Sequence, residues 1–148
     1  MNNTRFAVAL HILTLLAVEN KCQPTTSVYL AESANTNPVV IRRLLGSLRR
    51  AGLISVQLGA GGGVSLARTA REITLLDVFC AVRETEMFFL DTRKSNPYCI
   101  CGRNMQPVLA GIFREVEGAA YQKLAQITLD QVALQVEERD LDYPPAGG

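Results

Sequence analysis

Two cysteines separated by a single residue have the clearest capacity for chemistry in this sequence. Cys99 and Cys101 lie in a polar segment between Lys94 and Arg103, just ahead of a predicted helix. Cations and a helix N-terminus both favour the thiolate, and a thiolate in an accessible loop can be oxidised. The pair is therefore a candidate redox sensor, and an unreactive pair of loop cysteines fits the same residues about equally well.

The remaining residues argue against a metal centre or an enzyme. Of the other cysteines, Cys22 lies in a loop and Cys80 lies in an apolar helix, where we expect a buried small hydrophobe. His11 is the only histidine, and we expect it to be an ordinary helix residue. Iron–sulfur clusters and structural zinc sites commonly take four ligands, so we predict no metal site. With no base near Cys99 and no Ser-His-Asp pattern, we predict no catalytic residues and no enzyme.

A cluster of arginines occupies one short predicted helix, from Pro38 to Arg50. Asn37 suits the N-cap, Pro38 the first helical position and Gly52 the residue that ends the helix. One face of this helix is apolar, made of Ile41, Leu44, Leu45 and Leu48. The opposite face is cationic and narrow enough for a DNA major groove, although an ordinary solvated basic face is the alternative for this helix alone.

The segments around this helix favour the DNA interpretation. A short helix over 26–33 precedes it, and strands over 53–58 and 64–67 follow it, joined by a turn at 59–63. Helix, turn, helix and wing together form a DNA-reading unit. The glycine-rich turn is not a phosphate-binding loop, because no Gly-Lys-Ser or Gly-Lys-Thr and no helix follow it.

We therefore predict double-stranded DNA as the partner and assign candidate contacts. Val39, Arg43 and Ser47 are expected to approach base edges, and Arg42, Arg50 and Arg68 to contact phosphates. The rest of the predicted DNA-binding set is Ser27, Tyr29, Gly61 and Gly62. The charge distribution agrees: residues 1–71 carry eight cations and two anions, and the remainder carries seven cations and twelve anions, which gives +6 and −5. A basic half beside an acidic half is typical of a polyanion-binding module joined to one that avoids polyanions.

The length of 148 residues fits one domain with an added element. The apolar run from Phe6 to Val18 is too short to span a membrane and lacks a cleavage site, so we predict a core helix, no membrane partner and a cytoplasmic location. We predict a DNA-binding domain over 1–82, with its last helix over 75–82, a sensor loop region over 83–103, dimerisation helices over 104–140 and a disordered tail over 141–148. The long helix is expected to start near Asn104, because Pro107 suits only a first turn.

These motifs together resemble the Rrf-two family of bacterial winged-helix transcription regulators. The matching residues are Asn37–Leu45, Ala51–Ile54, Gly59–Gly63 with Leu66–Arg68, Ile73–Val78 and Asn96–Cys99. The resemblance runs from about Arg5 to Leu134. It implies a fold that is mainly α with a small β-hairpin: a winged helix-turn-helix domain plus a long C-terminal dimerisation helix that crosses to the partner subunit.

The resemblance also implies a homodimeric repressor or activator that senses iron–sulfur status, redox state or a small molecule. Iron–sulfur members carry three grouped cysteines in the loop, usually with one further ligand, whereas this chain has only Cys99 and Cys101 there. We therefore expect a thiol-type repressor without a cofactor. An iron–sulfur sensor and a winged-helix protein-interaction adaptor that does not bind DNA are the alternatives.

Overall fold

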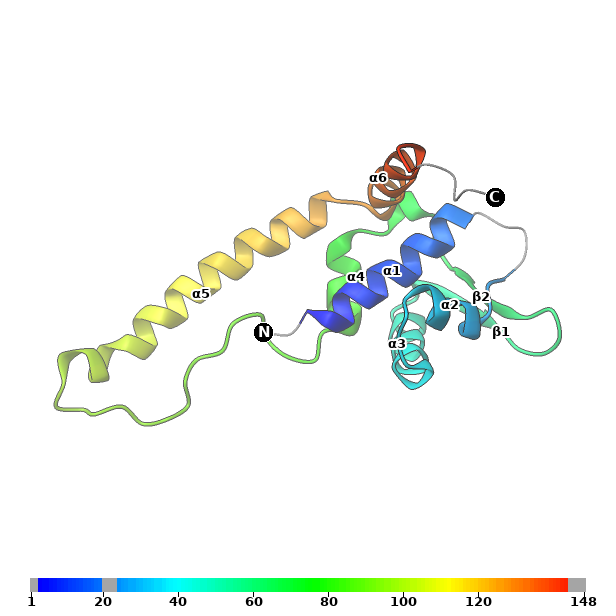
Figure 1. Cartoon of the computed structure of the whole chain (residues 1–148). Coiled ribbons are helices and arrows are strands. Elements are labelled where there is room, and N and C mark those ends of the chain that lie inside the picture. The colour runs from blue at the N-terminus through cyan, green and yellow to red at the C-terminus, as the bar shows by residue number, and fades with distance from the viewer. Residues whose placement is uncertain (1–2, 20–23, 144–148) are drawn as a thin grey trace.

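The computed structural model describes residues 3–19 and 24–143. Its helices are α1 (Thr4–Glu19), α2 (Ser27–Ser33), α3 (Pro38–Arg50), α4 (Leu75–Val82), α5 (Ile100–Gln126) and α6 (Leu129–Leu141), with a short 3-10 helix, η1 (Ala70–Glu72), before α4. Strands β1 (Ile54–Gln57) and β2 (Gly63–Leu66) form an antiparallel hairpin. Figure 1 shows that α1 to α4 and the hairpin form one body, that α5 extends away from it and that α6 lies against it. The observed fold class is the predicted one.

The core lies where α1, α2, α3, α4 and the hairpin meet. All four apolar residues predicted for the inner face of α3 are buried, as are Ile12, Leu13 and Leu30 from the first two helices. A helix as short as α2 or α3 is stable only when its apolar face is packed in this way. The core thus holds α3 against the domain by one face and leaves the other to solvent.

The hairpin has a precise register and a turn that requires glycine. Ile54 pairs with Leu66 and Gln57 with Gly63. Gly59 and Gly61 have φ of 90° and 75°, and a Cβ at Gly62 would lie 2.2 Å from the Gln57 carbonyl oxygen. Side chains at these positions would therefore strain or open the turn.

A third extended segment joins the hairpin to the start of α2. Thr25 and Val64 form an isolated antiparallel bridge, with N–H···O distances of 2.9 and 2.7 Å in the two directions. This bridge could not be predicted from the sequence, because a single paired residue has no periodicity. It fixes the hairpin beside α2 and α3, which is the arrangement that a DNA-reading wing requires.

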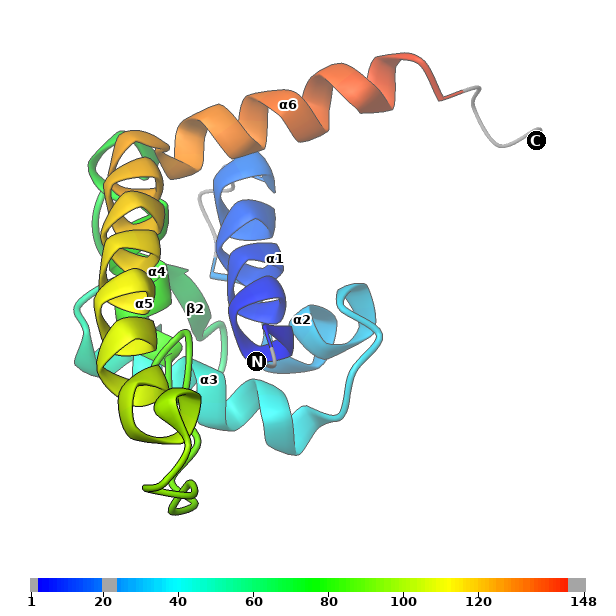
Figure 2. The same ribbon diagram turned by 90° about the vertical axis from the view of Figure 1, so that its left-hand side faces the viewer.

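The C-terminal helices leave the domain and return to it at one point. After α4 the chain runs through a long loop to α5, and Figure 2 shows α5 beside α4 with α6 crossing the end of α1. Thr74 and Thr128 form an isolated bridge, in which Leu75 N–H donates to the Ile127 carbonyl at 2.9 Å and Leu129 N–H to the Ile73 carbonyl at 2.8 Å. Leu129 is fully buried, so the start of α6 belongs to the core of the DNA-binding part.

The structure corrects three expectations. The long helix starts at Ile100 and not near Asn104, because a turn at Asn96 nucleates it earlier: Tyr98 N–H donates to the Asn96 side chain at 2.9 Å. Pro107 is then inside the helix, where its ring faces solvent. Cys80 is exposed and not buried, since α4 packs through its other face. Leu141 ends α6 and is not part of a disordered tail. The part of the predicted tail after Tyr143 lies outside the described residues. Cys22 lies outside them as well.

Candidate nucleic-acid interface

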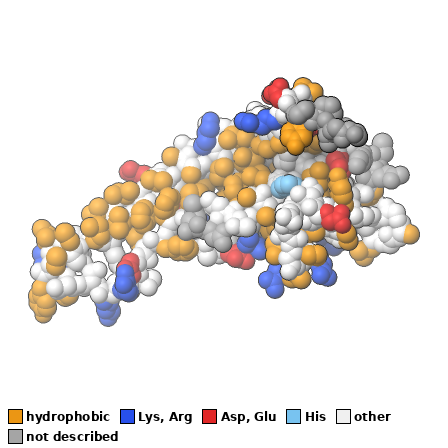
Figure 3. All heavy atoms as spheres, in the orientation of Figure 1, with side chains coloured by type: hydrophobic (Ala, Val, Ile, Leu, Met, Phe, Trp, Pro, Cys, Tyr) orange, Lys and Arg blue, Asp and Glu red, His pale blue; other side chains and the backbone are white. Residues whose placement is uncertain are grey.

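Helix α3 presents a basic face that its caps and its buried face orient. Asn37 Oδ1 accepts a hydrogen bond from Val39 N–H at 2.8 Å, and Pro38 occupies the first turn. With the apolar face buried, the exposed side chains are Pro38, Val39, Arg42, Arg43, Arg49 and Arg50. In Figure 3, Lys and Arg side chains gather around the outer end of α3, whereas much of the visible surface of α5 is apolar.

Hydrogen bonds within α3 hold part of this face in place. Ser47, which is half-buried, donates from its hydroxyl to the Arg43 carbonyl at 3.3 Å, and Arg50 donates to the Ser47 hydroxyl at 3.3 Å. Arg42 donates from Nε to the Pro38 carbonyl at 3.4 Å. The predicted base-reading positions Val39, Arg43 and Ser47 thus lie on the solvent side of α3, with Arg42 and Arg50 beside them.

Helix α2 places two further predicted residues next to α3. Thr26 caps α2 by accepting a hydrogen bond from Tyr29 N–H at 3.2 Å, and Ser27 and Tyr29 are both exposed. The Tyr29 hydroxyl donates to Glu19 at 2.7 Å, so the phenol is oriented by α1. Asn35, with φ of 47°, makes the tight turn that separates α2 from α3.

The N-terminal end of α2, the face of α3 and the turn of the hairpin line one groove. It includes the predicted residues Ser27, Arg42 and Gly62, and also Arg49, which the prediction omitted. Arg49 lies two helical turns after Arg42 on the same side of α3, so helical spacing alone could have identified it. Gly61 is exposed at the tip of the turn, where Leu58 is also 87% exposed.

A second groove is lined by more arginines than the first. It runs between α3, the start of α1 and the end of α4, and it is lined by Arg5, Arg42, Arg43, Arg50 and Arg83, with Glu84 as its acidic member. Arg5 and Arg83 were missed because they lie far from α3 in the sequence, and only the packing of α1 and α4 brings them there. A surface of this charge attracts a polyanion such as the DNA backbone.

Arg68 differs from the other predicted phosphate contacts, because it has partners within the chain. Its Nη2 forms an ion pair with Asp77 at 2.9 Å and donates to the Glu72 carbonyl at 3.0 Å. Asp77 also accepts a hydrogen bond from Thr74 N–H at 2.9 Å, so one carboxylate joins the end of the hairpin to the cap of α4. A phosphate contact by Arg68 would compete with these interactions.

The same carboxylate predicts a pH dependence of stability. Burial by itself raises the pKa of Asp77, but hydrogen bonds from Thr74 and Arg68 outweigh it and leave the pKa below its ordinary value. The stabilisation is present above the unfolded-state pKa and is lost as the pH falls through the lower folded-state value. We expect the wild type to lose more stability than Asp77→Asn between pH 6 and pH 3, by less than about 1 kcal/mol because the group is solvent-accessible. Urea unfolding of both proteins at each pH measures this difference, and parallel profiles would contradict it.

Cys99 and Cys101 lie at the exposed start of α5. Cys99 is the N-cap residue, and backbone hydrogen bonds from Gly102 and Cys101 lower the pKa of its thiol. Arg103 was expected to assist, but its Nη1 donates to the Pro97 carbonyl at 3.2 Å. The backbone amides at the start of α5 are therefore the largest cause of the lower pKa, and the Cys101 side chain adds to it. Gly102 is required here, because a Cβ would lie 2.0 Å from the Asn96 carbonyl oxygen.

Comparison with known proteins identifies the family. The family model for Rrf2, described as an iron-dependent transcriptional regulator, matches residues 2–135. The chain is 38% identical over 132 residues to the HTH-type transcriptional regulator YwnA of Bacillus subtilis, covering 89% of this chain and 96% of YwnA. It is 31% identical over 126 residues to Protein rrf2 of Nitratidesulfovibrio vulgaris, covering 85% and 82%.

A solved structure supports the fold. T. potens IscR superimposes with a TM-score of 0.72 at 22% identity and covers all of this chain and 93% of its own. This likeness concerns the fold only.

Among the described residues, no ligand set fits the iron that the family description names. In the ranges 3–19 and 24–143, no group of three or more His, Cys, Asp or Glu side chains could hold a metal ion. Within those same ranges, no helix is long and apolar enough to cross a membrane.

The winged helix-turn-helix, its basic face and the match over nearly the whole chain agree on one identity. The relatives are transcriptional regulators and not enzymes. This chain belongs to the Rrf2 family of DNA-binding transcription regulators.

Proposed function

We propose that the protein is a homodimeric repressor that reads a pseudo-palindromic operator with α3 and the hairpin. The observation that carries this proposal is the basic, outward face of α3, on which Val39 and Arg43 are exposed, beside the wing that lines a groove with Arg42 and Arg49. A dimer of helix-turn-helix units binds half-sites about one helical turn, or a multiple, apart. Bound across a promoter, such a dimer represses by occupying the DNA, and it works in the cytoplasm, where bacterial DNA is found.

The test of this interface compares two arginines on the same helix. If Arg43 reads a guanine, Arg43→Ala is expected to cost about 1–3 kcal/mol of binding to the operator and to relax the base preference at one position. If Arg50 contacts phosphate, Arg50→Ala is expected to weaken all sequences alike and to lower the salt slope by about one. Both are measured by titrating labelled upstream DNA of the chain's own gene at several salt concentrations. Wild-type affinity in both variants would reject the interface and favour the adaptor.

The second subunit is inferred from the apolar surface of α5. None of its side chains is buried, and Met105, Val108, Ile112 and Val116 are each about half exposed along one stripe. On its other side, Phe88 of the preceding loop stacks on Phe113, with ring centroids 5.3 Å apart. A helix with so much uncovered apolar surface is typical of an interface. The same helix from a second copy is the occupant that the symmetry of an operator requires.

Cys99 is the proposed sensor, and no cofactor is needed for it. A peroxide accepts an electron pair from the thiolate and leaves Cys99 as a sulfenic acid, while the other peroxide oxygen departs as water or an alcohol. A second thiol then condenses with the sulfenic acid, releasing water and forming a disulfide. A Cys99–Cys101 bond would be strained, so a low-molecular-weight thiol or a partner-subunit cysteine is an equally suitable second thiol.

The redox prediction is tested by substitution. Peroxide treatment is expected to change the operator affinity of the wild type and of Cys101→Ser but not of Cys99→Ser, because the amides at the start of α5 stabilise the thiolate of Cys99. Intact mass identifies the product, and Cys80→Ser serves as an exposed-cysteine control. Equal affinities across all reduced and oxidised samples would leave the pair without a sensing role, and a visible iron–sulfur absorption after anaerobic purification would favour the cluster alternative.

A further inference from the structure

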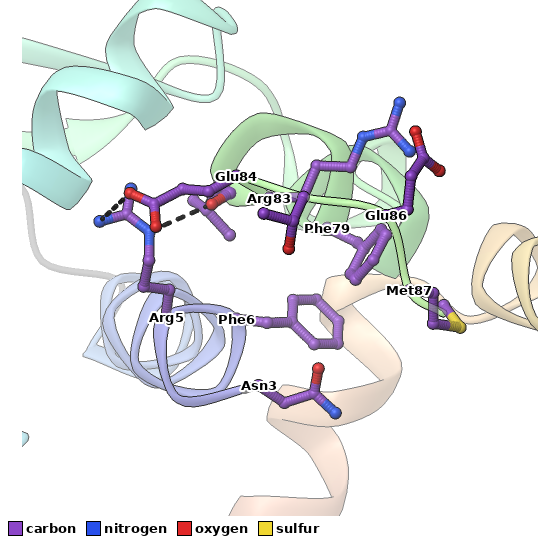
Figure 4. Close-up of a pocket in the computed structure, with 10 residues that line it drawn as sticks. Asn3, Arg5, Phe6, Phe79, Arg83, Glu84, Glu86 and Met87 are labelled. Carbon is purple, nitrogen blue, oxygen red and sulfur yellow. Dashed lines mark hydrogen bonds and ion pairs between the residues drawn. The ribbon is translucent and has the colours of Figure 1, made fainter. Parts of the chain in front are cut away.

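A cavity of about 140 Å³ lies between the start of α1, the end of α4 and the loop that follows α4 (Figure 4). Figure 4 shows Phe6 and Phe79 facing each other in the middle, with Met87 on one side and the paired Arg5 and Glu84 on the other. The two rings meet edge to face, with centroids 5.4 Å apart. The cavity therefore combines an apolar floor with a charged wall, the usual composition of a small-molecule site.

The charged wall carries both signs in balance. Arg5 Nη1 and Glu84 Oε1 lie 3.5 Å apart, and Arg5 Nε also donates to the Val82 carbonyl at 3.2 Å. Arg83 and Glu86 complete the wall, giving two cations and two anions. A ligand with a net charge would be repelled by the two wall side chains that carry the same sign of charge. A ligand that carries both charges can instead pair with Arg5 and Glu84 together.

The volume and the floor limit the rest of the ligand. A cavity of about 140 Å³ is close in volume to one of roughly 150 Å³ that binds benzene, so it favours a ligand of a few heavy atoms. The rings of Phe6 and Phe79 and the thioether of Met87 favour an apolar group of a few carbons. These limits describe a small free amino acid.

We propose that this cavity binds a small amino acid with an apolar side chain. Its carboxylate would bind Arg5, its ammonium would bind Glu84, and its side chain would lie against Phe6 and Phe79. No covalent step is involved. Binding itself does not depend on the proposed operator recognition, and only its effect on DNA rests on that function.

The position of the cavity gives it a route to the DNA-binding face. Arg5, Arg83 and Glu84 line both the cavity and the neighbouring groove that contains Arg43 and Arg50 of α3. Arg83 Nη1 also lies 3.2 Å from the Tyr121 hydroxyl on α5. A ligand that separates Arg5 from Glu84 would therefore move two charged side chains that lie beside the recognition helix, and it would lie next to Arg83, which contacts the helix proposed to join the subunits.

The test is calorimetry on the full chain without DNA. Glycine, L-alanine, L-valine and L-methionine are titrated at millimolar concentrations, together with 3-methylbutanoate and 2-methylpropylamine, which are L-valine without its amino group and without its carboxyl group. We expect at least one amino acid to bind, and both valine analogues to bind at least about tenfold more weakly than L-valine, since each loses a charge-assisted hydrogen bond.

Glu84→Gln is the matched variant, because Glu84 is 68% exposed and its loss leaves the core intact. It is expected to weaken amino-acid binding at least about tenfold, whereas Glu115→Gln, on the exposed surface of α5, is expected to bind like the wild type. Circular dichroism checks the folding of both. No binding by any of the amino acids, equal binding of L-valine and its analogues, or wild-type binding by Glu84→Gln would each overturn the site.

A second measurement separates this proposal from the proposed function. Operator affinity is measured with and without the bound amino acid. A change of at least about threefold supports the coupling, and unchanged affinity overturns it. Failure of the protein to bind any DNA would refute the operator proposal. The calorimetry would still show whether the cavity binds an amino acid.

Discussion

Ile112→Asp is expected to convert the protein into a monomer and to lower its operator affinity by about 10²–10³-fold. Ile112 lies in the middle of the exposed apolar stripe of α5, and it is 48% exposed in the single chain. In a two-fold interface each substitution appears twice, and each carboxylate loses water without gaining a cation, at a cost of several kcal/mol. A monomer then loses the avidity that two linked half-site contacts provide.

Sedimentation equilibrium at micromolar concentration measures the first effect, and titration of the full operator against an isolated half-site measures the second. Gln122→Asp is the control, because it adds the same charge to an exposed polar position of the same helix. It should remain a dimer with wild-type affinity. A dimeric Ile112→Asp protein, or a wild type that sediments as one chain, would reject α5 as the interface.

Leu44→Ala is expected to reduce the free energy of unfolding by about 2–5 kcal/mol. Leu44 is fully buried on the inner face of α3, so its truncation leaves a cavity between α3 and the rest of the core. Domains of this size are stabilised by only about 5–15 kcal/mol, and the loss is therefore a large share of the total. Because the packing of this face orients the basic face, we also expect operator affinity to fall.

Urea unfolding at one fixed protein concentration measures the stability change, since a dimer's midpoint depends on concentration. Val39→Ala is the comparison on the opposite face of the same helix. Val39 is 46% exposed, so its truncation should change the stability by no more than about 0.5 kcal/mol while it reduces the proposed base contact. Equal stability losses in the two variants would show that α3 is not packed as described.

The elements predicted from sequence were those with strong local signals. Helix α3 was found with its cap, its first residue and its four buried side chains, because periodicity and capping residues agree there. Helix α4 was placed with its bounds and its Thr74 cap for the same reason. The hairpin was located to within one or two residues, since a glycine-rich turn between two apolar stretches leaves few alternatives.

The features missed depend on contacts between distant segments. Neither the bridge between Thr25 and Val64 nor the one between Thr74 and Thr128 leaves a pattern in the sequence. The exposure of Cys80 depends on which side of α4 meets the core. Arg5 and Arg83 join the basic groove only through the packing of α1 and α4. Helix α5 starts before the predicted Asn104, because the turn at Asn96 begins the helix and Pro107 is accommodated inside it.

The bridge between Thr74 and Thr128 has an evolutionary consequence. It brings together the two ends of the segment between Thr74 and Thr128, which contains α5. This helix therefore extends from the DNA-binding core and does not pass through it. Whole turns can be added to or removed from such a helix without disturbing the buried residues, since none of those residues lies on α5. In the proposed dimer, changes in the length of α5 would thus alter how far apart the two cores are held. A lineage of such regulators can acquire new operator spacings while the surface that reads each half-site stays the same.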